Sequence, residues 1–557
     1  MALGHRVDTD KVIEEAQDHA VHKHTVDRVD LHDVAYVSRY EVDLNIPRFD
    51  LPKEGVDARV AYQLLHDELS LDGLPQLNLA SFVHTWVPPE CTQLMMENLN
   101  KNLVDQDEYP AAQDIHERCV SMISGLWNAP KDAKPMGTAT TGSSEAIMLG
   151  GLALKRRWEE NRKKAGKSIH EPGPNIIMGA NAQVALEKFA RYFDVECRLV
   201  DVTVKGNYVM DPKDAIKLVD ENTIGVFVIL GSTYTGAFEN VKEMADELDR
   251  YEEKTGHYVP IHVDGASGGF VAPFVYPDLE WDFRIPRVQS INASGHKYGM
   301  SAVGVGWIIW RSAEFLPSRM IFELHYLGET DFSFNLNFSR PTHPILGQMF
   351  NFINLGYEGY RRIMSANLTK SRILSRALED SGYFTVVSQI HLPKKGAESL
   401  SDDDPNKYLQ GLPVVGFRFT DEVYKKYPEV KQMWLQNQLR QVSWIVPNYA
   451  LPPSCDKTEI LRVVIRESMS GDLLRKLIQD IINCTETLLY DGGSTVASAQ
   501  AAAHAKQASA SDAAPKRHGH TGLKSGNSNR DTARAHKKGA LPHEEIKDNH
   551  HSHSHVC

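Results

Sequence analysis

The sequence lacks the features that would place the protein in a membrane, outside the cell or on a nucleic acid. No apolar run approaches the roughly 18 residues of a transmembrane helix. The amino-terminal segment lacks the apolar core of a secretory signal peptide. The six cysteines form no CxxC pair, so neither a zinc centre nor a disulfide framework is indicated. A net charge of −12 argues against nucleic acid as the main partner. We therefore expect a cytoplasmic protein without a bound metal.

The chain is long enough for more than one domain. Its 557 residues are 42% hydrophobic and 24% charged, as in ordinary globular proteins. Residues 1–60 are polar, and residues 61–345 alternate helical patterns with short β-branched runs such as "IGVFVILG" and "YVPIHVDG". Residues 346–490 are first helical and then mixed. This order predicts the α/β fold class, with a mostly parallel sheet covered by helices on both faces and a small C-terminal α+β domain.

The last region, residues 491–557, differs in composition from the rest. It contains no Phe, Tyr or Trp and is rich in Ala, Ser, His and Lys. From Thr495 onward nine basic residues face five acidic ones, whereas the preceding chain has 52 basic and 68 acidic residues. A segment of this kind buries too little apolar surface to order itself, so we interpret it as a disordered polar tail.

One lysine, Lys297 in "SINASGHKYG", is surrounded by small residues. Such space suits a lysine that reacts through its amine, because burial or a neighbouring positive charge lowers the pKa of a lysine. The preceding His296 offers a ring nitrogen to a phosphate. Taken alone, a Gly-His-Lys sequence is more often an exposed surface turn.

Two further segments favour a reactive lysine. Asp264 ends the strand pattern "YVPIHVD", and ligands gather at the carboxyl ends of parallel strands. In "TGSSEA", Ser143 and Ser144 precede a helix that we expect to begin near Glu145, where free N–H groups form an anion site. Taken alone, Asp264 is equally consistent with a helix-cap or turn aspartate, and a serine before a helix is more often a plain cap. Together they suit pyridoxal 5′-phosphate: the lysine binds its aldehyde, the carboxylate pairs with its ring nitrogen and the helix end holds its phosphate.

These segments, with "NLNFSRP" and "LNKNLVDQDEYP", closely resemble motifs of the glutamate decarboxylases, group II pyridoxal-phosphate-dependent decarboxylases of fold type I. The resemblance runs from about Arg59 to Leu489. It implies a central seven-stranded sheet and conversion of L-glutamate to 4-aminobutanoate and carbon dioxide. It also implies a homodimer or larger homo-oligomer with active sites at the subunit interface, and an N-terminal segment, 1–60, that packs on the partner.

The resemblance assigns cofactor roles to individual residues. It implies that Lys297 binds the cofactor covalently and that Asp264 pairs with the pyridine nitrogen. The other cofactor contacts that it implies are Ser143, Ser144, Gln183, Thr233, Ala266, Ser294, His296 and Ser339. Of these, Ser339 resembles a ligand supplied by the neighbouring subunit.

The resemblance also implies the substrate contacts. Arg462 in "LRVVIRE" matches the arginine that binds the α-carboxylate. The distal carboxylate pocket matches Ser81, the N–H of Phe82 and, across the interface, Asn102 and Asp105. Ser81 stands where bacterial members are expected to have threonine, and the hydroxyl is kept.

Two mechanistic hypotheses follow from these assignments. A carboxylate beside a substrate carboxylate repels it, so we expect Asp105 to be protonated when glutamate is bound and activity to be favoured below neutral pH. Tyr326 in "ELHYLGE" resembles a residue on a mobile active-site loop, and we assign it part of the proton delivery to the product carbon.

Other functions remain open at this point. One is a different pyridoxal-phosphate reaction, either decarboxylation of another amino acid or carbon–carbon lyase chemistry, against which the polar pocket argues. Another is a non-catalytic scaffold, against which Lys297, Asp264 and Arg462 argue. Plant relatives carry a calmodulin-binding tail, but residues 491–557 lack the large apolar anchors that such helices need, so we do not expect calmodulin binding. The terminal "HHSHSH" offers metal ligands or a pH sensor, but a solvated tail is the simpler interpretation.

Overall fold

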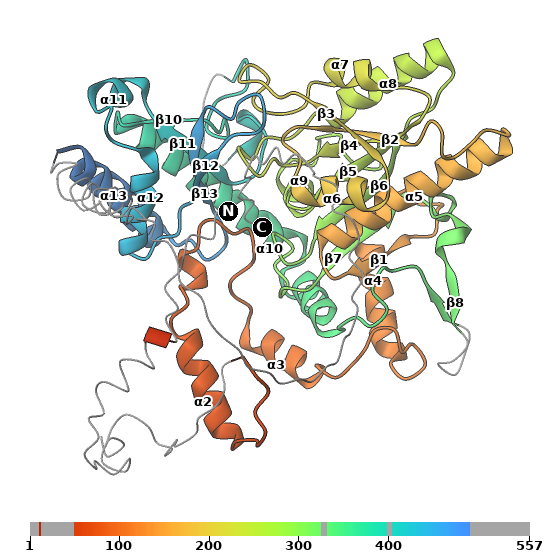
Figure 1. The fold of residues 1–557 in the computed structure, drawn as a ribbon, viewed down its shortest axis with the longest axis horizontal. Helices are drawn as coiled ribbons and strands as arrows, with labels where there is room; N and C mark the ends of the chain where they lie inside the picture. Colours follow the sequence, from red (N-terminus) through yellow and green to blue (C-terminus); the bar gives the residue numbers. More distant parts are fainter. Residues whose placement is uncertain (1–10, 13–48, 325–330, 398–403, 491–557) are drawn as a thin grey trace, which may run out of the picture. The chain divides into compact units, whose positions relative to one another are not determined.

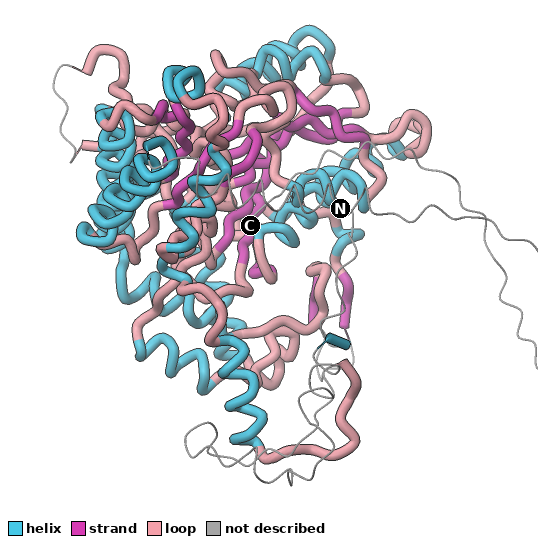
Figure 2. The backbone as a smooth tube through the Cα atoms, turned by 60° about the vertical axis from the view of Figure 1, so that its left-hand side comes forward, coloured by secondary structure: helices cyan, strands magenta, loops and turns pink. Residues whose placement is uncertain are grey.

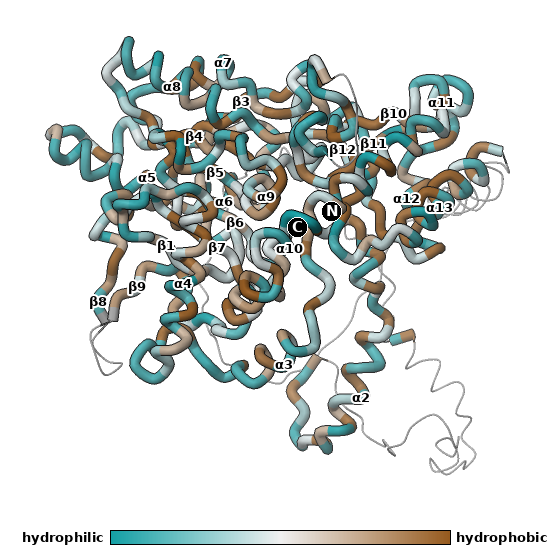
Figure 3. The backbone as a smooth tube through the Cα atoms, turned by 180° about the vertical axis from the view of Figure 1, so that it is seen from behind, coloured by the Kyte–Doolittle hydropathy of each residue, from teal (hydrophilic) through white to brown (hydrophobic). Residues whose placement is uncertain are grey.

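The computed structural model describes residues 11–12, 49–324, 331–397 and 404–490, which separate into two units, Met1–Gly73 and Leu74–Cys557. In the first unit, helix α2 (Ala58–Leu69) starts at Asp57, whose side chain accepts a hydrogen bond from the Arg59 N–H at 2.8 Å. Hydrophobic and hydrophilic residues alternate along α2 (Figure 3). The predicted tail, 491–557, and most of the predicted N-terminal segment, 1–60, lie outside the described residues, and the packing of that segment on a partner stays a prediction.

A seven-stranded sheet forms the centre of the second unit (Figure 1). Its strands are β1 (Met136–Thr140), β2 (Asn175–Gly179), β3 (Glu196–Val200), β4 (Thr223–Ile229), β5 (Ile261–Asp264), β6 (Val288–Ser294) and β7 (Gly306–Trp310). They are arranged in the order β1-β7-β6-β5-β4-β2-β3, and every neighbouring pair is parallel except the two that include β7. This arrangement confirms the predicted fold class.

Helices cover both faces of the sheet (Figure 2). One face carries α4 (Pro110–Leu126), α8 (Val241–Thr255), α9 (Ala272–Val275) and α10 (His343–Asp380). The other carries α5 (Ser143–Lys164) and α6 (Val184–Tyr192). Strand β4 shows the alternation, because Val226 and Val228 pack with the first group of helices and Phe227 and Ile229 with the second. A strand buried on both faces is apolar at nearly every position, which is why its sequence lacks a polar alternation.

The C-terminal part of the second unit has its own antiparallel sheet, in the order β10-β11-β13-β12. Its elements are β10 (Phe384–Val386), β11 (Val414–Phe419), α11 (Asp421–Lys426), α12 (Gln432–Gln441), β12 (Asn448–Ala450), β13 (Glu459–Val464) and α13 (Gly471–Tyr490). The remaining helices and strands of the second unit are α3 (Pro89–Glu97), α7 (Pro212–Ala215), β8 (Phe322–Leu324) and β9 (Asp331–Ser333). The C-terminal α+β pattern predicted from the sequence is confirmed, while a domain boundary near residue 345 stays a prediction. None of the helices in the described ranges has the length and apolar character that crossing a bilayer requires.

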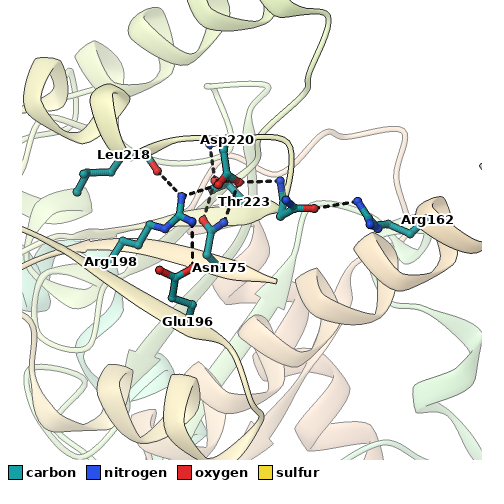
Figure 4. Close-up of polar contacts among 8 residues, drawn as sticks. Arg162, Asn175, Glu196, Arg198, Leu218, Asp220 and Thr223 are labelled. Carbon is teal, nitrogen blue, oxygen red and sulfur yellow. Dashed lines mark hydrogen bonds and ion pairs between the residues drawn. The ribbon is translucent and has the colours of Figure 1, made fainter. Parts of the chain in front are cut away.

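A polar network holds the amino ends of β2, β3 and β4 together (Figure 4). Asp220 accepts hydrogen bonds from Asn175 Nδ2 at 2.8 Å and from Arg198 Nη1 at 2.7 Å, and Arg162 of α5 donates to Asn222 Oδ1 at 2.8 Å. Burial raises the pKa of Asp220, but these hydrogen bonds outweigh burial and the net shift lowers it. The network therefore stabilises the sheet at the end opposite to Asp264, which closes the carboxyl end of β5.

Candidate active site

A small cavity lies where β4 and β5 end. Its wall consists of Asn181, Gln183, Ile229, Gly231, Thr233, Asp264, Ala266, Ser267 and Lys297. The structure therefore brings five of the predicted cofactor residues together: Gln183, Thr233, Asp264, Ala266 and Lys297. These residues are far apart in the sequence and meet because the carboxyl ends of parallel strands share one edge of the sheet.

Lys297 lies in the turn that follows β6 and is only 9% exposed. Its Nζ lies 5.4 Å from the centroid of the Phe82 ring, and the guanidinium carbon of Arg462 lies 5.1 Å from the same centroid. An aromatic face attracts cations at such distances. The predicted cofactor lysine and the predicted substrate arginine thus both contact the Phe82 ring.

Arg462 extends from β13 and is 2% exposed. Its Nη1 donates to the Thr233 carbonyl at 2.7 Å, and its Nη2 donates to the Ala80 carbonyl. Its buried Nε has no hydrogen-bond partner among the described residues, and the two acceptors of its Nη atoms are neutral carbonyls. A buried cation without a counter-ion is costly, so this position suits an anionic ligand.

Asp264 is 5% exposed, and its orientation is fixed by two donors. Its Oδ1 accepts from the Ala266 N–H at 3.0 Å and from Asn292 Nδ2 at 2.9 Å. Asn292 is the residue of β6 that pairs with Asp264 in the parallel register. Sequence analysis missed Asn292, although it lies within "SINASGHKYG", because the strand register that brings the two residues together cannot be read from the sequence.

The start of α5 differs slightly from the prediction. The helix begins at Ser143, not near Glu145, so both serines occupy its first turn, where backbone N–H groups lack helical partners. The buried Glu145 accepts hydrogen bonds from the Thr141 N–H at 2.8 Å and the Leu336 N–H at 3.1 Å. It therefore connects the start of α5 to the segments that contain Thr141 and Leu336. The physical reason for the earlier start is that Gly142, with an extended backbone, precedes the helix directly.

Two more predicted cofactor residues precede Lys297 closely in the chain: Ser294 ends β6, and His296 lies in the same turn as Lys297. His296 Nδ1 lies 2.8 Å from the Val305 carbonyl, so it carries the proton and leaves Nε2 as the acceptor. Burial, together with the charge of Lys297, lowers the pKa of His296 to about 4. The hydroxyl of Ser294 is buried and has no hydrogen-bond partner among the described residues. Both side chains therefore retain capacity for a further polar contact.

The residues predicted to act across an interface lie next to each other but not on this cavity. Asn102 Nδ2 donates to Ser339 Oγ at 3.2 Å, and Asn102 Oδ1 accepts from the Arg340 N–H at 3.0 Å. The N–H of Asp105 donates to the Asn102 carbonyl at 3.1 Å. Tyr326 lies outside the described residues, so its role stays a prediction.

The segment that contains Ser81 and Phe82 is fastened to the residues that follow β13. Arg466 Nη1 donates to the Val83 carbonyl at 2.6 Å, and His84 Nδ1 lies 2.9 Å from Glu467 Oε1. Burial raises the pKa of Glu467, but the neighbouring His84 and a hydrogen bond from the Thr85 N–H outweigh burial, so the net shift lowers it. These contacts hold the Phe82 ring near Lys297 and Arg462.

Replacing Glu467 with glutamine should loosen this segment and reduce the acid sensitivity of the fold. The pKa of Glu467 is lower in the folded than in the unfolded protein, so its negative charge stabilises the fold. This stabilisation is fully present above the ordinary carboxyl pKa of about 4.3 and is lost as the pH falls through the pKa of the folded protein. We expect Glu467→Gln to lower the free energy of unfolding at pH 7 by about 1–3 kcal/mol. The difference from the parent should shrink toward pH 4.

Thermal unfolding at both pH values measures this effect. Glu358→Gln, which replaces an exposed glutamate of α10, is the matched control and should leave the stability unchanged at both pH values. An equal loss of stability at both pH values would show that the charge of Glu467 is not what holds the segment.

Two buried residues beside the cavity were missed altogether. Asn181 lines the cavity and donates through Nδ2 to Glu239 Oε1 at 3.1 Å. Glu239 also accepts from the N–H groups of Ile229, at 2.6 Å, and Met210, at 3.2 Å. Burial raises the pKa of Glu239 to about 7. Asn181 lies two residues before the predicted contact Gln183, but nothing in the sequence spacing points to Glu239.

Comparisons with known proteins agree with this geometry. A family model described as the pyridoxal-dependent decarboxylase conserved domain matches residues 55–394. A glutamate decarboxylase of Solanum lycopersicum is 47% identical over 448 residues, covering 80% of this chain and 84% of the relative. One from Saccharomyces cerevisiae is 46% identical over 467 residues, covering 80% of each. Among solved structures, a Lactobacillus brevis glutamate decarboxylase aligns with a TM-score of 0.73 at 35% identity, covering 80% of this chain and 96% of that one.

Proposed function

The chain belongs to the pyridoxal-dependent decarboxylase family, and we propose that it acts on L-glutamate, releasing the α-carboxylate as carbon dioxide and forming 4-aminobutanoate. The observation that carries the proposal is the meeting of three groups. Lys297 and Asp264 line one cavity, and the buried Arg462 contacts the same Phe82 ring as Lys297. A scaffold without catalytic function has no need of a buried lysine and a buried arginine, bound only to neutral carbonyls, around one aromatic ring.

The residues present fit pyridoxal 5′-phosphate. The unpartnered Ser294 hydroxyl, the acceptor nitrogen of His296 and the two serines at the start of α5 are polar groups with capacity for a phosphate or a ring substituent. Lys297 would bind the aldehyde covalently, and Asp264 would hold a proton on the ring nitrogen. When bound, this cofactor supplies an acceptor for the electron pair of a breaking carbon–carbon bond.

Arg462 determines which bond breaks. We assign it the substrate α-carboxylate, which it would hold beside Lys297 through a charge-assisted hydrogen bond in water-poor surroundings. Holding a reacting group in the productive orientation can lower a barrier by about 7–11 kcal/mol. The Ala266 N–H and Asn292 Nδ2 hold the Asp264 carboxylate in one orientation. Tyr326 remains our candidate for delivering a proton to the product carbon.

The distal carboxylate pocket is assigned to Ser81 and the N–H of Phe82, completed by Asn102 and Asp105 from a second copy. Asn102 and Ser339 form a hydrogen bond with each other but do not line the cavity of their own chain. This position is expected of two residues that complete the active site of a partner subunit. We therefore propose a homodimer or a larger homo-oligomer with shared active sites, working in the cytoplasm. Calmodulin binding is not part of the proposal, and the tail that would carry it lies outside the described residues.

Replacing Asp105 with asparagine should broaden the pH profile of the reaction. A charged Asp105 would repel the distal carboxylate of glutamate, whereas a protonated Asp105, or an amide, can donate a hydrogen bond to it. We expect Asp105→Asn to keep its activity within about tenfold of the parent below pH 5 and to lose less of it toward pH 7. Carbon dioxide release from glutamate across this range measures the profile.

The matched control for that variant is Asp107→Asn, which replaces an exposed aspartate two residues away. Its profile should follow the parent. An Asp105→Asn profile that coincides with the parent's would rule out the proposed protonation.

The substrate is tested by offering the purified protein glutamate, aspartate and tyrosine and measuring carbon dioxide and the amine product. We expect 4-aminobutanoate from glutamate at a kcat/KM well above those for the other two. Equal or greater turnover of tyrosine or aspartate would overturn the assignment of the distal pocket. Failure to retain any pyridoxal phosphate would overturn the whole proposal.

A further inference from the structure

A row of buried polar side chains crosses β5 and β6 beneath helix α5. His262 Nδ1 lies 2.7 Å from Ser290 Oγ, and His262 Nε2 lies 2.8 Å from Asn292 Oδ1. Asn292 Nδ2 in turn donates to Asp264 Oδ1 at 2.9 Å. The parallel register pairs His262 with Ser290 and Asp264 with Asn292, so all four side chains lie on one face of the sheet.

The hydrogen bonds of this row all run in one direction. Because the amide nitrogen of Asn292 faces Asp264, its oxygen faces His262 and must accept from Nε2–H. The other ring nitrogen then accepts the proton of the Ser290 hydroxyl. Each donor therefore points along the row toward Asp264, an order that stabilises negative charge on that carboxylate.

The surroundings of His262 are otherwise apolar and tightly packed. The ring is fully buried, and its centroid lies 4.9 Å from that of Phe227. Burial lowers the pKa of His262 to about 4, so the ring is neutral near pH 7, as the direction of the hydrogen bonds requires. A buried imidazole in such a place costs free energy unless both nitrogens are paired, and here both are.

Helix α5 rests directly on this ring. A Cβ atom added at Gly150 would lie 2.6 Å from His262 Cε1, closer than any real contact, so glycine is what allows the approach. The same helix begins with Ser143 and Ser144, the proposed phosphate contacts. His262 is thus connected through Asn292 to Asp264. Its ring also contacts α5, the helix that begins at the proposed phosphate site.

We propose that His262 is a positioning residue that links Asp264 to the proposed phosphate site. It holds Asp264 in place through Asn292, and its contact with Gly150 sets the distance between α5 and the sheet. The inference rests on the proposed function, since it concerns how strongly pyridoxal phosphate is held. It adds a role for three residues that do not line the cavity: His262, Asn292 and Gly150.

The test compares His262→Phe with His262→Gln in the full-length protein. Phenylalanine fills the space but makes neither hydrogen bond, whereas the glutamine amide can still donate to Asn292. The affinity of the cofactor-free protein for pyridoxal phosphate and the pH dependence of the visible absorbance of the bound cofactor are the readouts. We expect His262→Phe to weaken the affinity by about tenfold or more and to shift the absorbance titration, and His262→Gln to recover most of both.

Asp220→Asn is the control, because it disturbs a polar network at the far end of the sheet and should lower thermal stability without changing cofactor affinity. If His262→Phe does not fold, Asn292→Ala decides, since it removes the donor to Asp264 and should weaken affinity similarly. A folded His262→Phe with parental affinity and titration would overturn the inference, as would parental values for Asn292→Ala. If the parent itself bound no pyridoxal phosphate, the proposed function would fail instead.

Discussion

Lys297→Ala should abolish the release of carbon dioxide from glutamate. The amine of Lys297 lines the cavity with Asp264, and the turn that carries it follows β6 directly, so no nearby lysine of the cavity wall can replace it. A positioned acid–base group alone contributes about 10²–10⁴-fold to a rate, and the loss of covalent attachment adds to this. We expect kcat to fall by at least that factor while the fold is retained.

The matched control is Lys217→Ala, which removes an exposed lysine whose side chain is 72% accessible. It should keep parental turnover and cofactor content. The midpoint temperature of thermal unfolding of Lys297→Ala should be close to that of the cofactor-free parent. Residual turnover within tenfold of the parent would show that another group performs the assigned role.

Arg462→Met should produce the second largest loss. Methionine keeps much of the buried length but cannot bind a carboxylate, so the substrate anion would enter a pocket without its counter-charge. Removing one partner of a buried, hydrogen-bonded charge pair costs about 2–5 kcal/mol, or roughly 30- to 5000-fold in kcat/KM. We expect both KM and kcat to worsen, because the same contact binds the substrate and orients the bond that breaks.

The interpretation of this variant needs a stability measurement, because Arg462 also donates to the carbonyls of Thr233 and Ala80. Arg475→Met, at an exposed site on α13, serves as the control for the substitution type and should leave both kinetics and stability unchanged. The assignment would be wrong if a folded Arg462→Met with normal cofactor content turned over glutamate at the parental kcat/KM.

Physical reasoning on the sequence predicted the architecture, Lys297 and Asp264, while the family resemblance supplied the other three predicted residues of the cavity wall, Gln183, Thr233 and Ala266. A run such as "IGVFVILG" has no polar position because β4 is buried on both faces, and a strand with an aspartate at its carboxyl end, such as β5, directs that aspartate to the ligand edge. The pairing of Lys297 with Asp264 in one cavity then follows from parallel topology alone.

What the sequence could not supply depends on register and close packing. The contact between Asp264 and Asn292 depends on the register between β5 and β6. The close packing of α5 on His262 depends on glycine, which has no side chain, at position 150. The start of α5 was misplaced by two residues because a helix end is decided by local backbone geometry as well as by residue type. Glu239 was missed because its partners come from three separate segments.

The central claim is that Lys297 carries pyridoxal phosphate, and borohydride reduction followed by peptide mass mapping tests it most directly. The account predicts a reduced pyridoxyl group on the peptide that contains Lys297, absent from Lys297→Ala. Recovery of that peptide unmodified, or a stoichiometric adduct on a different lysine, would contradict the account.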